Sequence, residues 1–347
     1  MVVQALSQDI ELMTIPLLSI CIPTYNREVF LKDCLESLKS SWCSDIEIVV
    51  SDNASTDGTL AMLEGYARQL PLRWQQQATN LGFDRNCAAV VSMARGRYCW
   101  LLGSDDCIAE GALAQIMVKL RQYDPDIFHF GYVQADSALR PMSRSAPSGS
   151  STPIAMNARE LPKYLSVLPN VSLLFAFISS FIFRRQSWID QQDRLPDWLD
   201  SHYVHTFMLH AMLAAGATVL STDKCFVIAR GGNPNEFNST VGKFLCLDAT
   251  TLQRINREIY SDASQHLAAL GCVFRRSYQI RSLISITANG GVQQILLCRS
   301  ALVALGHSKL LIQLLLWAER LGVMFIIARL IELRRSALNS GSLKQIS

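Results

Sequence analysis

The sequence predicts an α/β fold in which a mainly parallel sheet carries helices on both faces, followed by a C-terminal region made only of helices. Two patterns indicate the sheet. Short apolar runs alternate with amphipathic helical segments between residues 17 and 132, which is the order of strands and crossover helices. Clusters of polar residues follow several of these runs. A third pattern, helical periodicity alone over residues 245–347, indicates the C-terminal extension.

Each element of the first part has a local signal. Leu17–Ile22 is a short apolar run stopped by Pro23, as expected of a buried strand. The helix over 27–40 repeats apolar residues at helical spacing, and Asp57 is placed to cap a helix over 58–70. The other expected elements are strands at 46–50, 97–102 and 126–132 and helices at 84–95 and 110–122.

The middle of the chain has weaker signals. Residues 141–153, rich in Pro, Ser and Gly, are expected to form a loop between two halves. Residues 173–183 are expected to form a strand or strand pair, residues 203–215 a helix and residues 218–220 a strand.

Charge and cysteine usage limit the class of protein. The net charge is +3, but residues 271–347 hold ten basic and two acidic residues, which gives this segment +8 and the remainder −5. A basic, apolar tail on an acidic body indicates an anionic surface as partner, and its lack of interleaved aromatic residues argues against nucleic acid. The ten cysteines show neither CxxC nor metal-ligand spacing, so we expect them to be reduced in a cytoplasmic protein. The first residues carry acids in place of a basic n-region, so no secretory signal is expected.

Polar clusters follow three of the expected strands, at Thr24–Asn26, Asp52–Ser55 and Ser104–Asp106. In parallel α/β sheets, ligands bind beyond the carboxyl ends of the strands, so we expect the clusters to meet in one crevice. The absence of a GxGxxG motif argues against a dinucleotide site, and the absence of GxxxxGK[ST] excludes a P-loop.

Asp105 and Asp106 are adjacent carboxylates at the tip of an apolar strand. Like charges in contact raise the pKa of each other and repel, and a hard divalent cation with oxygen ligands relieves that cost. Such a cation typically arrives with a diphosphate. The alternative is a helix start, because Asp is a good N-cap and acids suit a first turn.

Four segments in this order, Ile22–Arg27, Val50–Thr59, Asn80–Asn86 and Leu102–Asp106, resemble the motifs of family 2 glycosyltransferases. The resemblance extends over residues 17–230. It implies a GT-A fold and inverting transfer from a nucleotide-diphosphate sugar. The Asn-Leu-Gly-Phe and Gly-Ser-Asp-Asp versions further resemble the abequosyltransferase-like subset, which adds a deoxyhexose to a lipid-linked O-antigen precursor.

The resemblance also implies a division of labour along the chain. Residues 1–140 form the half that binds the nucleotide sugar, which is CDP-abequose-like. Residues 141–240 form the acceptor-binding half of the same domain, and residues 241–347 form the helical C-terminal region. The residues expected at the donor are Pro23, Thr24, Tyr25, Asn26, Glu28, Asp52, Asn53, Arg85, Ser104, Asp105 and Arg230.

Several of these residues also have a purely structural interpretation. Asp52 resembles the family's exposed base-binding carboxylate but also suits a local turn. Arg85 falls where the family places a cation near the base and diphosphate, and it also suits a solvated helix surface. Glu28 is either a ligand of the base or ribose or a first-turn acid, whereas Asn80 and Gly82 are expected to shape their loop.

Asp105 and Asp106 resemble the family's metal-binding acids, which implies Mn²⁺ or Mg²⁺ bridging the diphosphate as a Lewis acid. Gly103 occupies the place of the first Asp in the usual DxD motif, so this chain offers fewer carboxylates. Arg230 opens an Arg-Gly-Gly-Asn segment that is expected to be either a loop closing over the donor or acceptor, or a plain surface turn.

An inverting transfer needs a general base beside the acceptor hydroxyl. Many relatives carry Glu-Asp at a fixed distance before an Ala-Gly turn, and counting back from Ala215-Gly216 gives Val204-His205. His205 is therefore a candidate base with a pKa near 6.5. His202, Asp200 and Asp197, just upstream, are its rivals, and if one of the two acids is the base then His205 only caps or packs.

The C-terminal region ends in a helical pattern over 307–335 that is too apolar for a fully exposed helix. Trp317 and flanking basic residues suit a helix lying in a membrane interface, and a core or homodimer helix is the alternative. The implied acceptor is a polyprenyl-diphosphate-linked oligosaccharide. The expected location is therefore the inner face of a bacterial cytoplasmic membrane, as a peripheral protein.

Two other functions fit the sheet and the acids. A sugar nucleotidyltransferase would place a Gly-rich basic loop after the first strand, which Pro23–Asn26 does not supply. A catalytically degenerate nucleotide-sugar-binding module is suggested by Gly103 and by the missing Glu-Asp.

Overall fold

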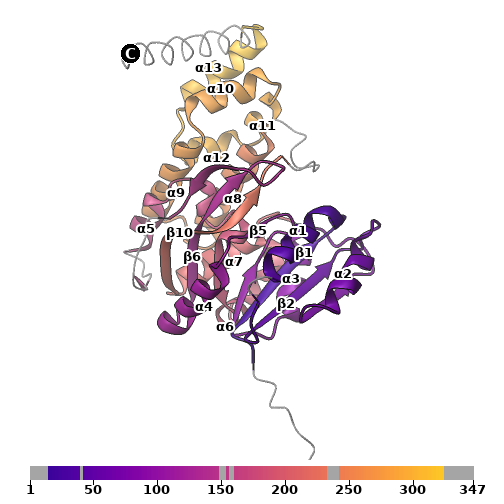
Figure 1. Ribbon diagram of the computed structural model, residues 1–347. Helices are drawn as coiled ribbons and strands as arrows, with labels where there is room; N and C mark the ends of the chain where they lie inside the picture. The colour runs from indigo at the N-terminus through magenta and orange to yellow at the C-terminus, as the bar shows by residue number, and fades with distance from the viewer. Residues whose placement is uncertain (1–14, 40–41, 148–153, 156–159, 233–241, 324–347) are drawn as a thin grey trace, which may run out of the picture.

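One mixed sheet runs through the larger part of the molecule (Figure 1). The computed structural model describes residues 15–39, 42–147, 154–155, 160–232 and 242–323. Within them the strand order is β3-β2-β1-β4-β9-β6-β10-β5, with β7 paired to β6 and β8 paired to β10. The strands are β1 (Leu18–Thr24), β2 (Ile46–Asp52), β3 (Leu72–Gln76), β4 (Tyr98–Leu101), β5 (Cys107–Ile108), β6 (Ile127–Ala135), β7 (Pro141–Ser145), β8 (Ile154–Ala155), β9 (Phe181–Arg184) and β10 (Thr218–Arg230).

The first four strands of this order form the parallel half of the sheet. β1 pairs in parallel with both β2 and β4, and β2 pairs in parallel with β3. Every residue of β1 and β2 is buried, as expected for strands covered on both faces. The predicted strands of this half are confirmed, whereas β3 was not predicted.

Four helices accompany this part: α1 (Glu28–Lys39), α2 (Thr59–Ala67), α3 (Phe83–Met93) and α4 (Ala112–Tyr123). α1 contacts α2, and α3 contacts β1, β2 and α7. The strand order reverses between β3 and β4, and right-handed crossovers therefore place α3 on the face opposite to α1 and α2.

The second half of the sheet contains antiparallel as well as parallel pairs, and it is the part with the weakest sequence signals. β9 runs antiparallel to β4 and to β6, and β10 runs parallel to β6. The predicted loop at 141–153 is wrong in its first residues, because Pro141–Ser145 pairs with β6 as β7. The predicted strand at 173–183 is also wrong over most of its length. Two 3₁₀ turns occupy 171–173 and 178–180, and only β9 is extended.

Pro23 does not stop the first strand, which continues to Thr24. The pairing of β1 with β4 ends at Cys21 and Leu101, and Leu102 N then donates to Cys21 O. Pro23 lies two residues beyond Cys21 and faces the same side of the strand, where β4 has ended. Its missing N–H therefore costs no ladder hydrogen bond.

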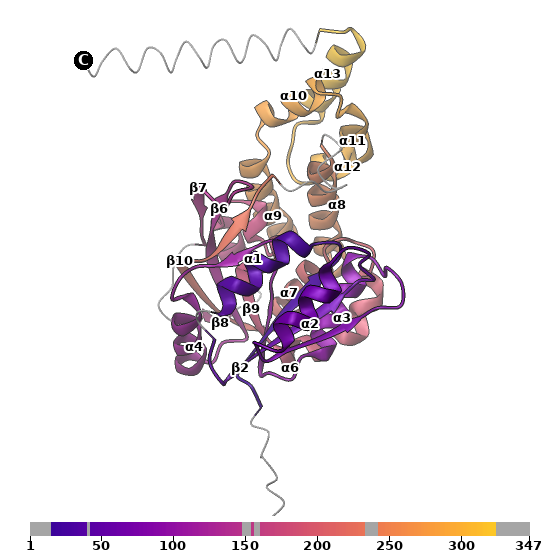
Figure 2. The same ribbon diagram turned by 45° about the vertical axis from the view of Figure 1, so that its right-hand side comes forward.

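Helices make up the rest of the described chain. α5 (Leu161–Val167), α6 (Arg185–Ile189) and α7 (Val204–Ala214) belong to the sheet region, where α5 packs against α9. Figures 1 and 2 both show the later helices extending away from the sheet, with α10 to α13 farthest from it. These helices are α8 (Lys243–Glu258), α9 (Ser264–Ser277), α10 (Ile280–Ala288), α11 (Val292–Leu297), α12 (Arg299–Ala304) and α13 (Lys309–Arg320).

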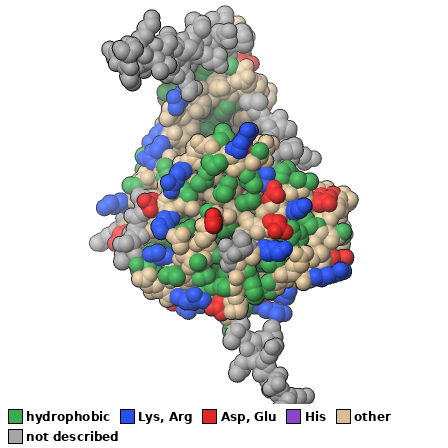
Figure 3. Space-filling model, in the orientation of Figure 1, with side chains coloured by type: hydrophobic (Ala, Val, Ile, Leu, Met, Phe, Trp, Pro, Cys, Tyr) green, Lys and Arg blue, Asp and Glu red, His purple; other side chains and the backbone are tan. Residues whose placement is uncertain are grey.

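The C-terminal helix is shorter than the pattern over 307–335 predicted. α13 ends at Arg320, and the chain turns at Gly322 with a φ of +70°. The predicted continuation beyond residue 323 lies outside the described residues. Among the helices that are described, none combines the length and apolarity needed to cross a bilayer. Acidic and basic side chains are interspersed over the face shown in Figure 3.

Candidate active site

The turns that follow β1 and β2 are bonded to each other at the carboxyl edge of the sheet. Asn53 N donates to Thr24 O at 2.9 Å, and Asn26 N donates to Ser55 Oγ at 2.8 Å. Thr56 N donates to Asn26 Oδ1 at 2.8 Å. Asn26 has a φ of +50°, a conformation that Asn tolerates better than most residues. The first two predicted clusters therefore do converge.

Asp52 lies at the end of β2 and is fully buried, not exposed as expected. Its two carboxylate oxygens accept from Ser55, one from the backbone N at 3.0 Å and the other from the hydroxyl. Asp52 therefore fixes the turn on which Ser55 meets Asn26. In this structure the buried carboxylate holds the turn in place from the protein interior.

Two asparagines hold the neighbouring loop. Asn53 Nδ2 donates to Asn80 Oδ1 at 2.8 Å, and Asn53 Oδ1 accepts from Leu81 N at 2.8 Å. Gly82 then starts α3 with a φ of +82°, so the expectation that Asn80 and Gly82 shape this loop is confirmed. Asn86, to which the sequence assigned no role, donates to Ser51 O at 3.1 Å and Thr24 O at 3.3 Å. It joins the ends of β1 and β2 from below.

Among the other expected donor residues, the aromatic ring of Tyr25 and the carboxylate of Glu28 are exposed at this edge. The Glu28 carboxylate lies over Gly58, where an added Cβ would come within 2.4 Å of it. Pro23 and Thr24 are buried. The Thr24 hydroxyl oxygen has no hydrogen-bond partner within the described chain.

The acidic turn after β4 is built around a buried serine. Ser179 Oγ donates to Asp106 Oδ2 at 2.6 Å and accepts from Gly103 N at 2.8 Å. A Cβ at Gly103 would lie 2.8 Å from Asp106 Oδ2 and 3.3 Å from Ser179 Oγ. Gly103 is therefore needed for close packing of this turn, and an acid there would displace it. The one available signal for Ser179 was a serine pair, Ser179-Ser180, after an apolar run.

The two adjacent acids have different surroundings. Asp105 is half-buried, whereas Asp106 is buried and its second oxygen accepts from Arg230 N at 3.1 Å. Burial, followed by the charge of Asp105, raises the pKa of Asp106 to about 8. Ser104 is buried beside them. Asp105 is thus the acid that can reach a ligand, and Asp106 forms the base of the turn.

Arg230 lies in the strand rather than in the loop that was predicted, as the last residue of β10. Its side chain is nearly buried, and its nitrogens donate to Asp33 Oδ2 at 2.6 Å, Ser137 O at 2.8 Å and Asp105 O at 3.1 Å. All three guanidinium nitrogens are engaged, so Arg230 braces the acidic turn against α1. The donor contact expected of Arg230 stays a prediction, since these bonds use three of the five N–H groups of the guanidinium.

The acids meet the requirements of a divalent cation only in part. In the described residues, no three His, Cys, Asp or Glu side chains form a metal-binding group. Both oxygens of Asp106 accept from protein donors, so the half-buried Asp105 is the better placed of the two acids to contact a cation. Mg²⁺ is often held by one or two carboxylates plus substrate phosphates, and Asp105 fits that arrangement.

The loop at 200–204 carries the candidate bases and is held by the first turn of α3. Buried Asp84 accepts from His202 N at 2.7 Å, Val204 N at 3.2 Å and Ser201 Oγ at 3.2 Å. The next residue, Arg85, forms a two-pronged ion pair with Asp200. This hydrogen bond lowers the pKa of Asp200 below its ordinary value. Asp84 is a site residue that the sequence did not reveal.

His205 lies in the core, in the first turn of α7, with 1% of its surface exposed. Burial lowers its pKa to about 4, so the expected pKa near 6.5 is wrong. Nε2 lies 3.2 Å from Ala176 O, and the rings of Phe83, Phe181 and Tyr203 pack around it. Nδ1 has no partner among the described residues.

Asp197 is exposed on the 3₁₀ segment Gln192–Trp198, and its carbonyl accepts from Arg254 of α8 at 3.3 Å. The structure thus joins Asp200 to the donor-side motif through Arg85, whereas Asp197 faces the C-terminal helices. The acidic turn and the carboxylate-bearing loop thus lie at the carboxyl edge of the sheet, where α/β folds bind their ligands.

Comparison with known proteins identifies the family. The model of glycosyl transferase family 2 matches residues 19–188. The abequosyltransferase RfbV of Salmonella typhimurium is 31% identical over 254 residues, which cover 71% of this chain and 76% of the relative. The poly(ribitol-phosphate) beta-N-acetylglucosaminyltransferase TarS of Staphylococcus aureus is 26% identical over 216 residues, covering 61% of this chain and 35% of TarS. The structure of TarS residues 1–349 with UDP-GlcNAc aligns with a TM-score of 0.56 and 19% identity, covering 88% of this chain and 92% of that one.

The chain belongs to glycosyltransferase family 2. Its fold is GT-A, with the helical C-terminal region appended, as the sequence predicted. It is a glycosyltransferase related to abequosyltransferase and to other enzymes of bacterial surface polysaccharides.

Proposed function

We propose that this glycosyltransferase moves a deoxyhexose, from a CDP-abequose-like nucleotide sugar, to a lipid-linked oligosaccharide in O-antigen synthesis. The observation that carries the proposal is the acidic turn at Asp105, set beside the joined turns of β1 and β2. The similarity to RfbV over most of both chains supports the choice of donor and acceptor.

The donor half supplies a platform of backbone groups and two reachable side chains. The turn at Tyr25 and Asn26 offers an exposed ring and backbone groups to a base edge. Asp52 and Asn53 keep this turn in place from inside, so we assign them to positioning. Arg85 is exposed and charged at the same edge, where it is suited to the diphosphate.

A divalent cation, Mn²⁺ or Mg²⁺, would be held by Asp105 together with the donor diphosphate, and when bound it stabilises the charge of the leaving group. Asp106 keeps Asp105 at the crevice through the Ser179 and Arg230 contacts. Because a single half-buried carboxylate is a weak cation site by itself, we expect little cation binding without nucleotide.

For inversion, the acceptor hydroxyl must lose its proton on the face opposite the diphosphate. We propose Asp200 as the base, because it is exposed and Arg85 ties its loop to the donor motif. Binding of the diphosphate to Arg85 would break the ion pair with Asp200 and so release the Asp200 carboxylate. His205 is the second candidate, since Nδ1 is unpaired within the described chain and Nε2 is oriented by Ala176 O.

Contact with an anionic membrane is proposed for α13. Its inward face is buried, but Leu310, Leu314, Trp317 and Leu321 form an outward stripe at helical spacing, each 50–76% exposed. Lys309 and Arg320 flank the stripe. A lipid-linked acceptor would lie in the inner leaflet, so this surface would hold the enzyme on the cytoplasmic face as a peripheral protein.

The membrane contact is tested by flotation with vesicles containing anionic lipid. Leu310→Gln with Trp317→Gln should abolish flotation, while the matched pair Val118→Gln with Met142→Gln, two exposed apolar residues elsewhere, should not. If the first pair instead dissociates a homodimer and leaves flotation unchanged, the stripe is a dimer interface and the membrane contact is refuted.

The reaction is tested by incubating the purified protein with CDP-, UDP-, GDP- and dTDP-linked sugars, Mn²⁺ and a polyprenyl-diphosphate oligosaccharide. We expect glycosyl transfer from a CDP-deoxyhexose with inverted anomeric configuration, read by NMR of the product. Release of pyrophosphate from a nucleoside triphosphate would identify a nucleotidyltransferase instead. Binding of a nucleotide sugar without transfer or hydrolysis would identify a binding module.

A further inference from the structure

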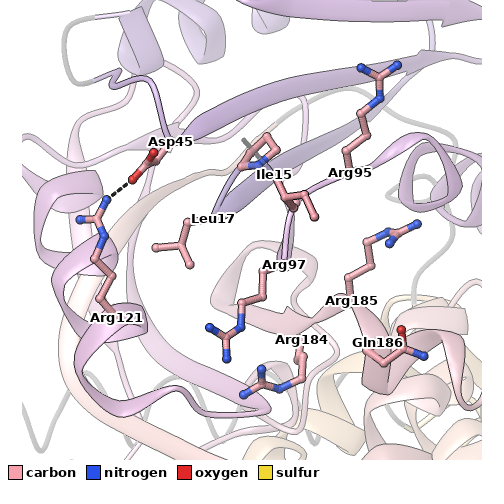
Figure 4. Close-up of a pocket in the computed structure, with 11 residues that line it drawn as sticks. Ile15, Leu17, Asp45, Arg95, Arg97, Arg121, Arg184, Arg185 and Gln186 are labelled. Atoms are coloured by element: carbon pink, nitrogen blue, oxygen red, sulfur yellow. Dashed lines mark hydrogen bonds and ion pairs between the residues drawn. The ribbon is translucent and has the colours of Figure 1, made fainter. Parts of the chain in front are cut away.

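Five arginines surround a pocket at the edge of the sheet opposite the candidate active site. Leu17, Asp45 and Arg97 each immediately precede a strand of the parallel half. The pocket that they line therefore lies at the amino ends of these strands. The pocket has a volume of about 610 Å³ and a wall formed by Ile15, Pro16 and Leu17. We call it the arginine pocket after the arginines that line it, which are Arg95, Arg97, Arg121, Arg184 and Arg185. Figure 4 shows them arranged around Ile15 and Leu17.

Acidic neighbours pair with three of the arginines. Arg121 pairs with Asp45, and Arg97 pairs with Asp124. Arg184 contacts Asp124 Oδ1 at 2.8 Å and Asp126 Oδ1 at 2.9 Å. These pairs hold the guanidinium groups in position on α4 and β9 and at the start of β4.

Arg95 and Arg185 have no acidic partner for their side chains in the part of the chain that the structure describes. Arg95 is exposed and Arg185 half-exposed, and both line the pocket. The local excess of positive charge therefore lies on these two residues. Ion pairs orient the other three guanidinium groups. A concave site with an excess of guanidinium groups is typical of an anion receptor.

We propose that the arginine pocket binds a soluble anion carrying two phosphate groups. Guanidinium groups match phosphate oxygens in two-pronged hydrogen bonds, and two of them without acidic partners suit two phosphates. The volume is that of a small-molecule site. This binding is separate from the donor site, because the pocket lies at the amino ends of β1 and β4 and the acidic turn lies beyond their carboxyl ends.

A lipid phosphate has the same chemistry as a soluble one, but the arrangement of the molecule favours the soluble source. The chain enters the sheet beside Ile15 at one end of the molecule, and α10 to α13 form the other end in both ribbon views (Figures 1 and 2). A molecule resting on a membrane through α13 would turn this pocket away from the lipid.

Calorimetric titration of the full chain with pyrophosphate, at constant ionic strength and with EDTA, tests the proposal. We expect one site whose Kd rises roughly tenfold or more in Arg95→Gln with Arg185→Gln, since charge-assisted hydrogen bonds are lost. The matched control is Arg68→Gln with Arg281→Gln, two exposed arginines outside the pocket that lose the same charge. The control should bind like wild type, and so should Asp105→Asn.

Each other outcome overturns the proposal. Absence of binding at about 1 mM pyrophosphate, or equal weakening in the control pair, leaves only nonspecific charge attraction. Loss of binding in Asp105→Asn but not in Arg95→Gln with Arg185→Gln places the pyrophosphate at the donor site. Binding to phosphatidylglycerol vesicles that depends on Arg95 and Arg185, in a protein that does not bind pyrophosphate, would identify a lipid headgroup as the ligand.

Discussion

The donor turns and the loop at 200–204 are stabilised in opposite ways. The turns after β1 and β2 hold each other, through Asn26 and Ser55 and through Asp52 beneath them. The loop at 200–204 depends on Asp84 and Arg85, which lie more than a hundred residues earlier, in the donor half. In the proposed mechanism, one turn of α3 positions the candidate base through Asp84 and contacts the donor diphosphate through Arg85, so donor binding and base placement share a support.

The largest effect is expected at the acidic turn. Asp105→Ala should lower kcat by roughly a thousandfold, because it removes the carboxylate that we propose holds a charge-stabilising cation. Steady-state rates with saturating donor measure this, and Asp193→Ala, at an exposed acid on the 192–198 segment, is the control. If Asp105→Ala retains more than about a tenth of wild-type kcat, the donor half does not stabilise the leaving group through this residue.

The next effect separates the two candidate bases. Asp200→Asn should lower kcat roughly a hundredfold with the protein still folded, because the exposed carboxylate is lost. His205→Gln should instead lower the free energy of unfolding by about 1–3 kcal/mol with kcat nearly unchanged, because the ring packs in the core. The reverse pattern, a folded but inactive His205→Gln and an active Asp200→Asn, would transfer the role of base to His205.

A smaller effect tests the long-range support itself. Asp84→Asn should lower kcat/KM for the acceptor by roughly tenfold, because an amide cannot accept from all three donors of the loop. Nucleotide affinity, measured by titration, should stay near wild type. Asp57→Asn is the mirror control: it loosens a turn within the donor half, where Asp57 accepts from Glu28 N and Thr59 N. Asp57→Asn should weaken nucleotide binding, and equal behaviour of the two variants would refute the distinction.

The same contrast explains what the sequence could predict. The strands and helices of the parallel half were found because buried strands and amphipathic helices alternate there. The donor turns were found because their interactions lie within short motifs. β3 was missed because Leu72–Gln76 is an edge strand that is largely exposed and polar. The run at 171–180 looks strand-like because it is apolar, yet its burial is achieved with 3₁₀ turns and Phe175 at a φ of +65°.

The acceptor side could not be predicted in the same detail because its contacts are long-range. Nothing near Asp84 in the sequence indicates that it accepts from residues 201–204. Arg230 pairs with Asp33 of α1, 197 residues earlier in the chain, so its position in a strand and its burial depend on packing. The core position of His205 likewise follows from rings that the sequence places up to 122 residues away. Sequence motifs indicated which positions to consider, but the contacts and burial of these residues follow only from the structure.

The smallest effect concerns the far side of the 200–204 loop, where Tyr203 reaches the C-terminal helices. Tyr203 and Tyr278 donate to the two oxygens of buried Asp248, at 2.6 and 2.7 Å. Burial raises the pKa of Asp248 to about 6, above the value near 3.9 of an unfolded chain. The folded protein then binds the extra proton, so this group favours folding below pH 4 and that contribution is lost as the pH rises to about 6.

Asp248→Asn removes this dependence while keeping a side chain of similar shape at the junction. Relative to wild type, its free energy of unfolding should gain roughly 1–3 kcal/mol between about pH 4 and pH 6 and change little above that range. Urea unfolding at several pH values measures the difference, with Asp190→Asn, an exposed acid, as the control for lost charge. Parallel curves for Asp248→Asn and wild type would show that Asp248 is already ionised in the folded protein at low pH. The loop would then be tied to the C-terminal helices through a charged group, in the way that Asp84 ties it to the donor half.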